Sequence, residues 1–196
     1  MTKKLLYACL LITTLAGCAS APPRDINNAC AVFNQRDSLF NDWHAAAKRA
    51  ERAYGIPVPI LMATLRRESG FQSDARPPRT KLLGMIPWSR PSSAYGYSQA
   101  LDGTWRQYRL ETGRSLARRN SFADAVDFVG WYHSRTVAMQ GVARNDAYNL
   151  YLAYYLGWSG FDRGAARGNK AVQGYARDMA RTAKRYEAQL ASCRSS

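Results

Sequence analysis

One carboxylate in the sequence has the surroundings that a general acid needs. Leu61, Leu65 and Glu68 recur at spacings of four and three, which places the three side chains on one face of a helix. Because the leucines mark that face as buried, we expect the carboxyl group of Glu68 to be shielded from water. Burial raises the pKa of an acid, so the group can deliver a proton near neutral pH. The alternative is a surface glutamate paired with Arg66 or Arg67.

A second acid and metal ligands have much weaker signals. Asp74, Asp102 and Asp162 are the candidates for a second carboxylate, but none lies in a recognisable motif, and solvated or capping roles are commoner. His44 and His133 have no partner at the spacing of a metal site, and there is no thiol cluster. The sequence therefore predicts neither a metal nor a cofactor.

The elements that position Glu68 are predicted to be helices. Apolar residues recur at helical spacings over 31–54, and a helix over 58–69 has proline in its first turn, where a missing N–H is harmless. Further helices are expected over 98–112, 121–140, 146–156 and 170–192. There is no internal repeat and no convincing run of alternating strand residues. The fold class predicted is all-α.

A long irregular segment, 70–94, follows the helix of Glu68. Its four prolines predict a loop, and its apolar residues argue against disorder. Both ends of this loop lie beside Glu68 in the predicted order of elements. We therefore expect 77–93 to form a lid or wall over the acid; the alternative is a surface insertion remote from it.

The segment around Glu68 resembles a known family. Residues 55–71 end in Glu-Ser-Gly-Phe, with Glu68 as the glutamate, and resemble the segment of the soluble lytic transglycosylases that ends in Glu-Ser and an aromatic residue. Ala75 matches the alanine that closes the family's motif. The resemblance spans roughly 54–161 and implies a lysozyme-like helical domain. The stretch between Glu68 and Gly96 is longer than the family usually has, so we expect this domain to carry a long active-site loop.

Two later motifs follow in the family's order. The family's Gly-Leu-Met-Gln is matched at Gly96 and Gln99. Its Ala-Tyr-Asn-x-Gly is matched by 153–157, where Tyr155 replaces the asparagine. The resemblance implies that five residues bind substrate: Tyr97, Ser98, Gln99, Tyr154 and Tyr155.

Individual roles follow for some of these residues. Tyr154 is expected to offer its hydroxyl to Glu68 or to an N-acetyl group, and core packing is the alternative for Tyr154 and Gln99. Gly96 is expected to allow a close approach of the backbone. Ser98 and Tyr155 stand where the family has Met and Asn, at positions that face the substrate.

The resemblance also implies a reaction. Glu68 would protonate the glycosidic oxygen between N-acetylmuramic acid and N-acetylglucosamine, and then accept the proton of the muramyl C6 hydroxyl. The product would be a 1,6-anhydro sugar. Because no water is consumed, no second carboxylate is needed, unlike in most glycosidases.

The first residues read as an export segment. Lys3 and Lys4 precede a short apolar run that is too short to span a membrane, and the run closes with Leu-Ala-Gly-Cys. This ending resembles the lipobox of bacterial lipoproteins, in which Cys18 would be acylated. We expect a signal peptide at 1–17, a tether at 18–29 and the enzyme domain at 30–196. Ala19, in place of Asp, directs such lipoproteins to the periplasmic side of the outer membrane.

The remaining cysteines and the net charge fit an exported protein. Cys9 leaves with the signal peptide, so Cys30 and Cys193 remain and are expected to pair in the oxidising periplasm; two unpaired thiols are the alternative. The chain has 28 Lys and Arg against 14 Asp and Glu, which suits an acidic partner. Nucleic acid is excluded as a partner by the compartment, so peptidoglycan strands and the membrane are expected.

Three other functions remain open at this point. A hydrolytic lysozyme would differ only in using water as the attacking group. A non-catalytic lipoprotein would hold peptidoglycan by its basic surface. The loop after Glu68 could also dock on a cell-envelope machine.

Overall fold

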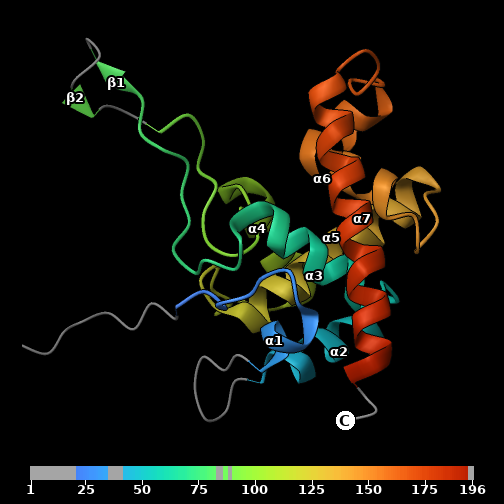
Figure 1. Ribbon diagram of the computed structural model, residues 1–196. Coiled ribbons are helices and arrows are strands. Elements are labelled where there is room, and N and C mark those ends of the chain that lie inside the picture. Colours follow the sequence, from blue (N-terminus) through green and yellow to red (C-terminus); the bar gives the residue numbers. More distant parts are fainter. Residues whose placement is uncertain (1–20, 35–41, 83–85, 88–89, 194–196) are drawn as a thin grey trace, which may run out of the picture.

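The computed structural model describes residues 21–34, 42–82, 86–87 and 90–193. Within these ranges there are seven helices and one hairpin of two short strands (Figure 1). In chain order they are α1 (Ala29–Phe33), α2 (Trp43–Tyr54), α3 (Val58–Ser69), β1 (Lys81–Leu82), β2 (Ile86–Pro87), α4 (Asp102–Thr112), α5 (Phe122–Gln140), α6 (Ala147–Asp162) and α7 (Lys170–Cys193). The prediction of an all-α, lysozyme-like domain is confirmed.

The expected signal peptide and Cys18 lie outside the described residues. Among the residues that are described, no helix combines the length and apolar character needed to cross a membrane.

Helix α3 lies at the centre of the fold and contacts α2, α5 and α7. Most of its sequence is apolar, and the side chains of Val58 and of 60–65 are buried on all sides of it. The helix ends at Gly70, which adopts the left-handed conformation at φ 59° and donates its N–H to the carbonyl of Arg66. Because α3 is held on several sides, its last turn, which carries Glu68, has a fixed position.

The prediction of one helix over 31–54 is wrong. Helix α1 ends at Phe33 with Asn34 as its C-cap, and α2 begins at Trp43. The carboxylate of Asp42 accepts a hydrogen bond from the N–H of Ala45 over 3.0 Å and caps α2. These polar capping residues favour separate helix ends over a continuous helix; the residues between them, 35–41, lie outside the described part.

Helix α6 bends at Gly157. The predicted helix ended at 156, whereas α6 continues to Asp162 through Gly157, whose backbone is at φ 70° and ψ 158°. Glycine is the residue that adopts such angles without a steric penalty. The bend redirects the chain at the last residue of the motif that contains Tyr154 and Tyr155.

An aromatic cluster joins several segments of the domain. The ring of Trp43 stacks on that of Phe122, with centroids 3.9 Å apart, and the edge of Tyr97 meets both rings. Phe71, just after α3, also contacts Trp43. The cluster therefore connects α2, α5 and the two turns that follow Glu68 and Gly96.

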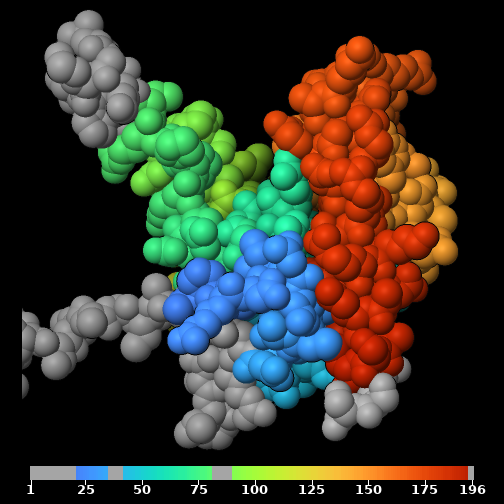
Figure 2. Space-filling model, viewed as in Figure 1, coloured from blue at the N-terminus to red at the C-terminus, as the bar shows by residue number. Residues whose placement is uncertain are grey.

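The segment between α3 and α4 forms an arm that stands away from the helices. Its two strands pair antiparallel, Lys81 with Pro87 and Leu82 with Ile86 (Figure 1). The short strands were not expected from the sequence. Figure 2 shows a deep notch between this arm and the projecting ends of α6 and α7.

The base of the arm is tied to the helical body. Arg119 donates to the carbonyls of Ser93 and Ala100 over 3.0 and 2.8 Å, and it pairs with Asp102 over 2.7 Å. The N–H of Gly96 donates to the carbonyl of Ala75 over 2.9 Å. The two ends of the arm therefore lie side by side.

The predicted disulfide is confirmed. Cys30 of α1 is bonded to Cys193 at the end of α7, with Cα atoms 6.0 Å apart, and the two cysteines are 163 positions apart in sequence. The bond joins the two ends of the described domain.

Candidate active site

The last turn of α3 delivers Glu68 into a cleft of about 430 Å³. The opposite wall comes from the bend in α6, and the remaining sides come from α5, the base of the arm and the start of α4. The lining residues besides Glu68 are Ser92, Ala94, Gln99, Ala100, Leu101, Thr104, Phe128, Tyr132, Tyr154, Tyr155, Leu156 and Gly157. The acid therefore faces a cleft with mainly aromatic and apolar walls.

Glu68 has the electrostatic properties of a proton donor at neutral pH. Burial raises the pKa of its carboxyl group from 4.5 to about 7, against the opposing effects of a hydrogen bond from Tyr151 and the charge of Arg67. The hydroxyl of Tyr151 donates to Oε1 of Glu68 over 2.8 Å. Near neutral pH the group therefore exchanges a proton readily in either direction.

The hydroxyl partner of Glu68 is Tyr151 and not Tyr154. The hydroxyl of Tyr154 instead donates to the carbonyl of Ser98 over 2.6 Å. Burial, followed by the charge of Glu68, raises the pKa of Tyr151, so this phenol remains a donor. The sequence offered a signal that was missed, because Tyr151 lies one turn before Tyr154 on the same side of α6.

The turn at 96–99 positions Gln99. Gly96 has a φ of 73°, and a Cβ there would lie 2.1 Å from the carbonyl oxygen of Arg119, so the expected close approach of the backbone is confirmed. The amide of Gln99 donates to the carbonyls of Ala75 and Gly96 over 2.9 and 2.8 Å. Its side chain lines the cleft while it joins both ends of the arm.

Tyr97 and Ser98 are placed differently from what the resemblance implied. Tyr97 is fully buried, and its ring packs edge-on against Trp43 and Phe122 rather than lining the cleft. Ser98 is also fully buried, and among the described residues its hydroxyl has no hydrogen-bond partner. Ser98 contributes through its backbone carbonyl, which holds Tyr154. The turn directs both side chains into the core, so neither is placed to contact a substrate.

Tyr155 lies at the rim of the cleft. It is 49% exposed, and its ring contacts Tyr151 and Tyr175 with centroids 6.2 and 5.7 Å away. Arg67 in turn lies over the ring of Tyr175 at 4.3 Å. An exposed aromatic ring beside the acid is suited to packing against a sugar ring.

A known protein family matches almost the whole chain. The family model described as the transglycosylase SLT domain matches residues 6–193. The chain belongs to this family. A search of curated proteins gives no significant match.

Ser69, next to the acid, has a structural role in this SLT domain that the sequence did not indicate. Its hydroxyl is placed to donate to the carbonyl of Tyr97 over 2.8 Å and to that of Leu65 over 3.2 Å. A small buried hydroxyl therefore couples the end of α3 to the turn that carries Gln99. This coupling fixes the position of the acid relative to the turn that carries Gln99.

The candidates for a second acid lie elsewhere in the SLT domain. Asp102 pairs with Arg119, Asp162 accepts a hydrogen bond from Gln140 over 3.3 Å, and Asp74 is exposed. Among the described residues that line the cleft, Glu68 is the one carboxylate.

A buried carboxylate that the sequence did not single out lies in α5. Asp127 accepts hydrogen bonds from Tyr54 and Tyr108 over 2.9 and 2.8 Å, and its second oxygen pairs with Arg114 over 2.8 Å. It does not line the cleft. Its network connects α2, α4 and α5, which is a structural role.

No metal-binding cluster of His, Cys, Asp or Glu occurs in the described part of the SLT domain. His133 is buried behind Tyr154, and its Nε2 lies 3.0 Å from the hydroxyl of Thr64. Burial lowers the pKa of His133 to about 3, so this ring is neutral at physiological pH.

The predicted lid contributes a wall at its base. Ser92 and, just beyond the segment 77–93, Ala94 line the cleft, whereas the hairpin at the tip stands away from the body (Figure 1). Residues 83–85 and 88–89 lie outside the described part. That the segment 77–93 covers Glu68 remains a prediction.

Proposed function

We propose that this chain is a peptidoglycan lytic transglycosylase. It cleaves the β-1,4 bond between N-acetylmuramic acid and N-acetylglucosamine and forms 1,6-anhydromuramic acid. The observation that carries the proposal is Glu68, whose pKa is raised to about 7 in a cleft whose other described lining residues carry no carboxylate. Membership of the SLT family supports the same reaction class.

The reaction uses Glu68 first as an acid and then as a base. Its protonated carboxyl group donates to the glycosidic oxygen while the bond from this oxygen to the muramyl C1 breaks. The carboxylate then accepts the proton of the C6 hydroxyl, whose oxygen bonds to C1. Glu68 regains its proton, and no water is consumed. A pKa near neutrality serves both steps.

The residues around Glu68 support this sequence of steps. Tyr151 occupies Oε1 of the carboxyl group, which leaves Oε2 for the substrate. Aromatic and apolar residues of α5 and α6 limit water beside the acid, and this favours attack by the sugar's own hydroxyl. Tyr155 at the rim offers a ring face for a sugar.

Mass analysis of fragments released from purified peptidoglycan tests the proposal. We expect muropeptides that end in the anhydro sugar and are lighter by one water than hydrolysis products. Fragments with a free reducing end would identify a hydrolytic lysozyme. Absence of any fragment would support a binding lipoprotein.

We also propose that the protein is a lipoprotein attached through Cys18 to the periplasmic side of the outer membrane. The support is the export segment and lipobox of the sequence, together with the Cys30–Cys193 bond, which suits an oxidising compartment. Replacing Cys18→Ser should release the protein from the membrane fraction. Retention of the variant in membranes at both low and high salt would contradict the anchor.

A further inference from the structure

A groove lined by arginines lies between α3 and α7, apart from the active-site cleft. Its volume is about 320 Å³, and its cations are Arg66 and Arg67 of α3 and Arg181 and Arg185 of α7. Asp178, which pairs with Arg181, is the one carboxylate of its lining. The groove therefore concentrates positive charge in a small space.

Two of these arginines are held by neutral oxygens rather than by acids. Arg66 donates to the carbonyl of Ile26 over 3.2 Å and to the side-chain oxygen of Asn27 over 2.6 Å. Arg185 donates to the hydroxyl of Thr182 over 3.5 Å. Neither forms an ion pair within the part of the chain that the structure describes. Their charges remain available to an anion from outside.

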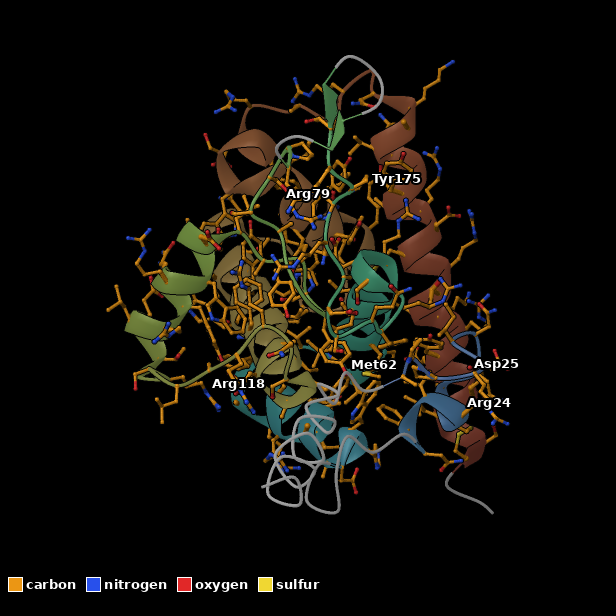
Figure 3. All side chains as sticks on the ribbon, turned by 90° about the vertical axis from the view of Figure 1, so that its left-hand side faces the viewer. Arg24, Asp25, Met62, Arg79, Arg118 and Tyr175 are labelled. Atoms are coloured by element: carbon orange, nitrogen blue, oxygen red, sulfur yellow. A yellow bond between two sulfur atoms is a disulfide. The ribbon has the colours of Figure 1, made fainter. Side chains whose placement is uncertain are left out.

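The positive surface continues along α7. Arg177, Arg181, Lys184 and Arg185 are exposed, and their spacings of three, four and seven place them on one side of the helix. Asp25 also lies beside α7, close enough to affect the pKa of Tyr186 (Figure 3). The cations nevertheless outnumber the acids on this side of the molecule.

The N-terminal segment joins the domain at the same place. Asn27 contacts Arg66, and it follows Cys18 by only nine residues, which even fully extended span about 30 Å. A lipid attached to Cys18 would hold this side of the domain close to the membrane surface. Positive charge here would thus meet phospholipid headgroups.

We propose that this surface docks on anionic phospholipids. We call it the arginine face and define it by Arg66, Arg181, Lys184 and Arg185. Guanidinium groups bind phosphate oxygens through paired hydrogen bonds, and cations near a negatively charged membrane are attracted within a Debye length. The arginine face therefore adds an electrostatic contact to the lipid anchor.

This contact would orient the active site. Arg67 lines the groove and is adjacent in sequence to Glu68, so the two side chains diverge by about 100° around α3. Arg66 points further still from Glu68. A membrane against the arginine face therefore leaves the cleft open toward the peptidoglycan.

Protection of Lys184 from a water-soluble acetylating reagent tests the arginine face. The full chain is labelled in solution, with phosphatidylcholine vesicles, and with vesicles that also contain phosphatidylglycerol. Acetylation is measured by mass spectrometry, with Lys48 as the internal reference. We expect labelling of Lys184 to slow by about threefold or more with phosphatidylglycerol alone, and to recover in 1 M salt.

Two double variants complete the experiment. Arg181→Gln with Arg185→Gln should abolish the protection of Lys184. Arg106→Gln with Arg118→Gln removes the same amount of charge from exposed positions, and Arg118 lies on the side of the molecule opposite α7 (Figure 3). This control variant should retain the protection of Lys184. Equal labelling with both vesicle types would overturn the proposal. Protection by soluble muropeptides but not by vesicles would also overturn it, and would assign the arginine face to stem-peptide carboxylates.

Discussion

The hydroxyl of Tyr151 donates a hydrogen bond to Oε1 of Glu68 over 2.8 Å, and it does so from the face of α6 that also carries Tyr154. This bond stabilises the charged carboxylate and so opposes the effect of burial on its pKa. Tyr151 therefore keeps the pKa of Glu68 close to neutrality, where proton donation and recovery are both efficient.

Replacing Tyr151→Phe should shift the pH dependence of cleavage. Loss of the hydrogen bond raises the pKa of Glu68 above about 7, so the alkaline limb of kcat/KM should move to higher pH. The profile should be measured on purified peptidoglycan. Tyr154→Phe is the control, because that hydroxyl donates to a backbone carbonyl and its loss should leave the limb in place. An unchanged limb in Tyr151→Phe would show that the hydrogen bond has no influence on the acid.

Replacing Glu68→Gln should abolish cleavage in a peptidoglycan zymogram, because an amide cannot donate and recover the proton. Activity within a few-fold of the wild type would refute the role of Glu68.

The Glu68→Gln variant should also be more stable than the wild type at alkaline pH. Between pH 4.5 and about 7, the folded wild type retains a proton on Glu68 that the unfolded chain has released. The free energy of unfolding of the wild type therefore falls as the pH rises through this window. The amide avoids this loss. Thermal unfolding should show a higher Tm for Glu68→Gln at pH 8 and equal values at pH 4; a lower Tm at pH 8 would contradict the burial of the acid.

Replacing Gly96→Ala should destabilise the domain by more than about 2 kcal/mol, because the new Cβ meets the carbonyl of Arg119 at 2.1 Å. Gly113→Ala is the matched control. It has a similar φ of 69° but no atom within 4 Å of the added Cβ, so about 1 kcal/mol of backbone strain is expected. Denaturant unfolding measures both, and equal losses would show that the close approach is relieved by movement of the chain.

Removing the disulfide should lower stability by about 2–4 kcal/mol, because the bond restricts a loop of most of the chain in the unfolded state. Unfolding of the Cys30→Ser and Cys193→Ser double variant measures this loss. Thiol counting on the unreduced, unfolded wild type is the check. Two reactive thiols there would rule out the bond.

The sequence predicted the elements whose patterns are local. Residues 58–69 have a helical period and proline and glycine at their boundaries, so α3 and the half-buried position of Glu68 could both be inferred. Gly96 was also identified, because a motif glycine signals a close backbone approach. These features depend on neighbours within one or two turns.

The remaining features depend on tertiary contacts. Tyr97 and Ser98 lie in a turn with positive φ at Gly96 and Gln99, so a motif match gave no indication of which side chains face the cleft. The choice between Tyr151 and Tyr154 as partner of Glu68 depends on how α5 and α7 hold α6 relative to the end of α3. The arm was identified as irregular, but its direction is set by Arg119, which is distant in sequence.

The Cys30–Cys193 bond has a mechanical consequence under the N-terminal lipid anchor proposed above. Tension on the N-terminal segment first meets the hydrogen bonds of Ile26 and Asn27 to Arg66 of α3, and then α1, whose covalent bond passes the load into the end of α7. Because α7 packs against α3, the load is shared between these two helices, and α1 cannot be peeled from the domain while the bond is intact. The bond thus limits how far a pulling force can open the N-terminal end of the domain.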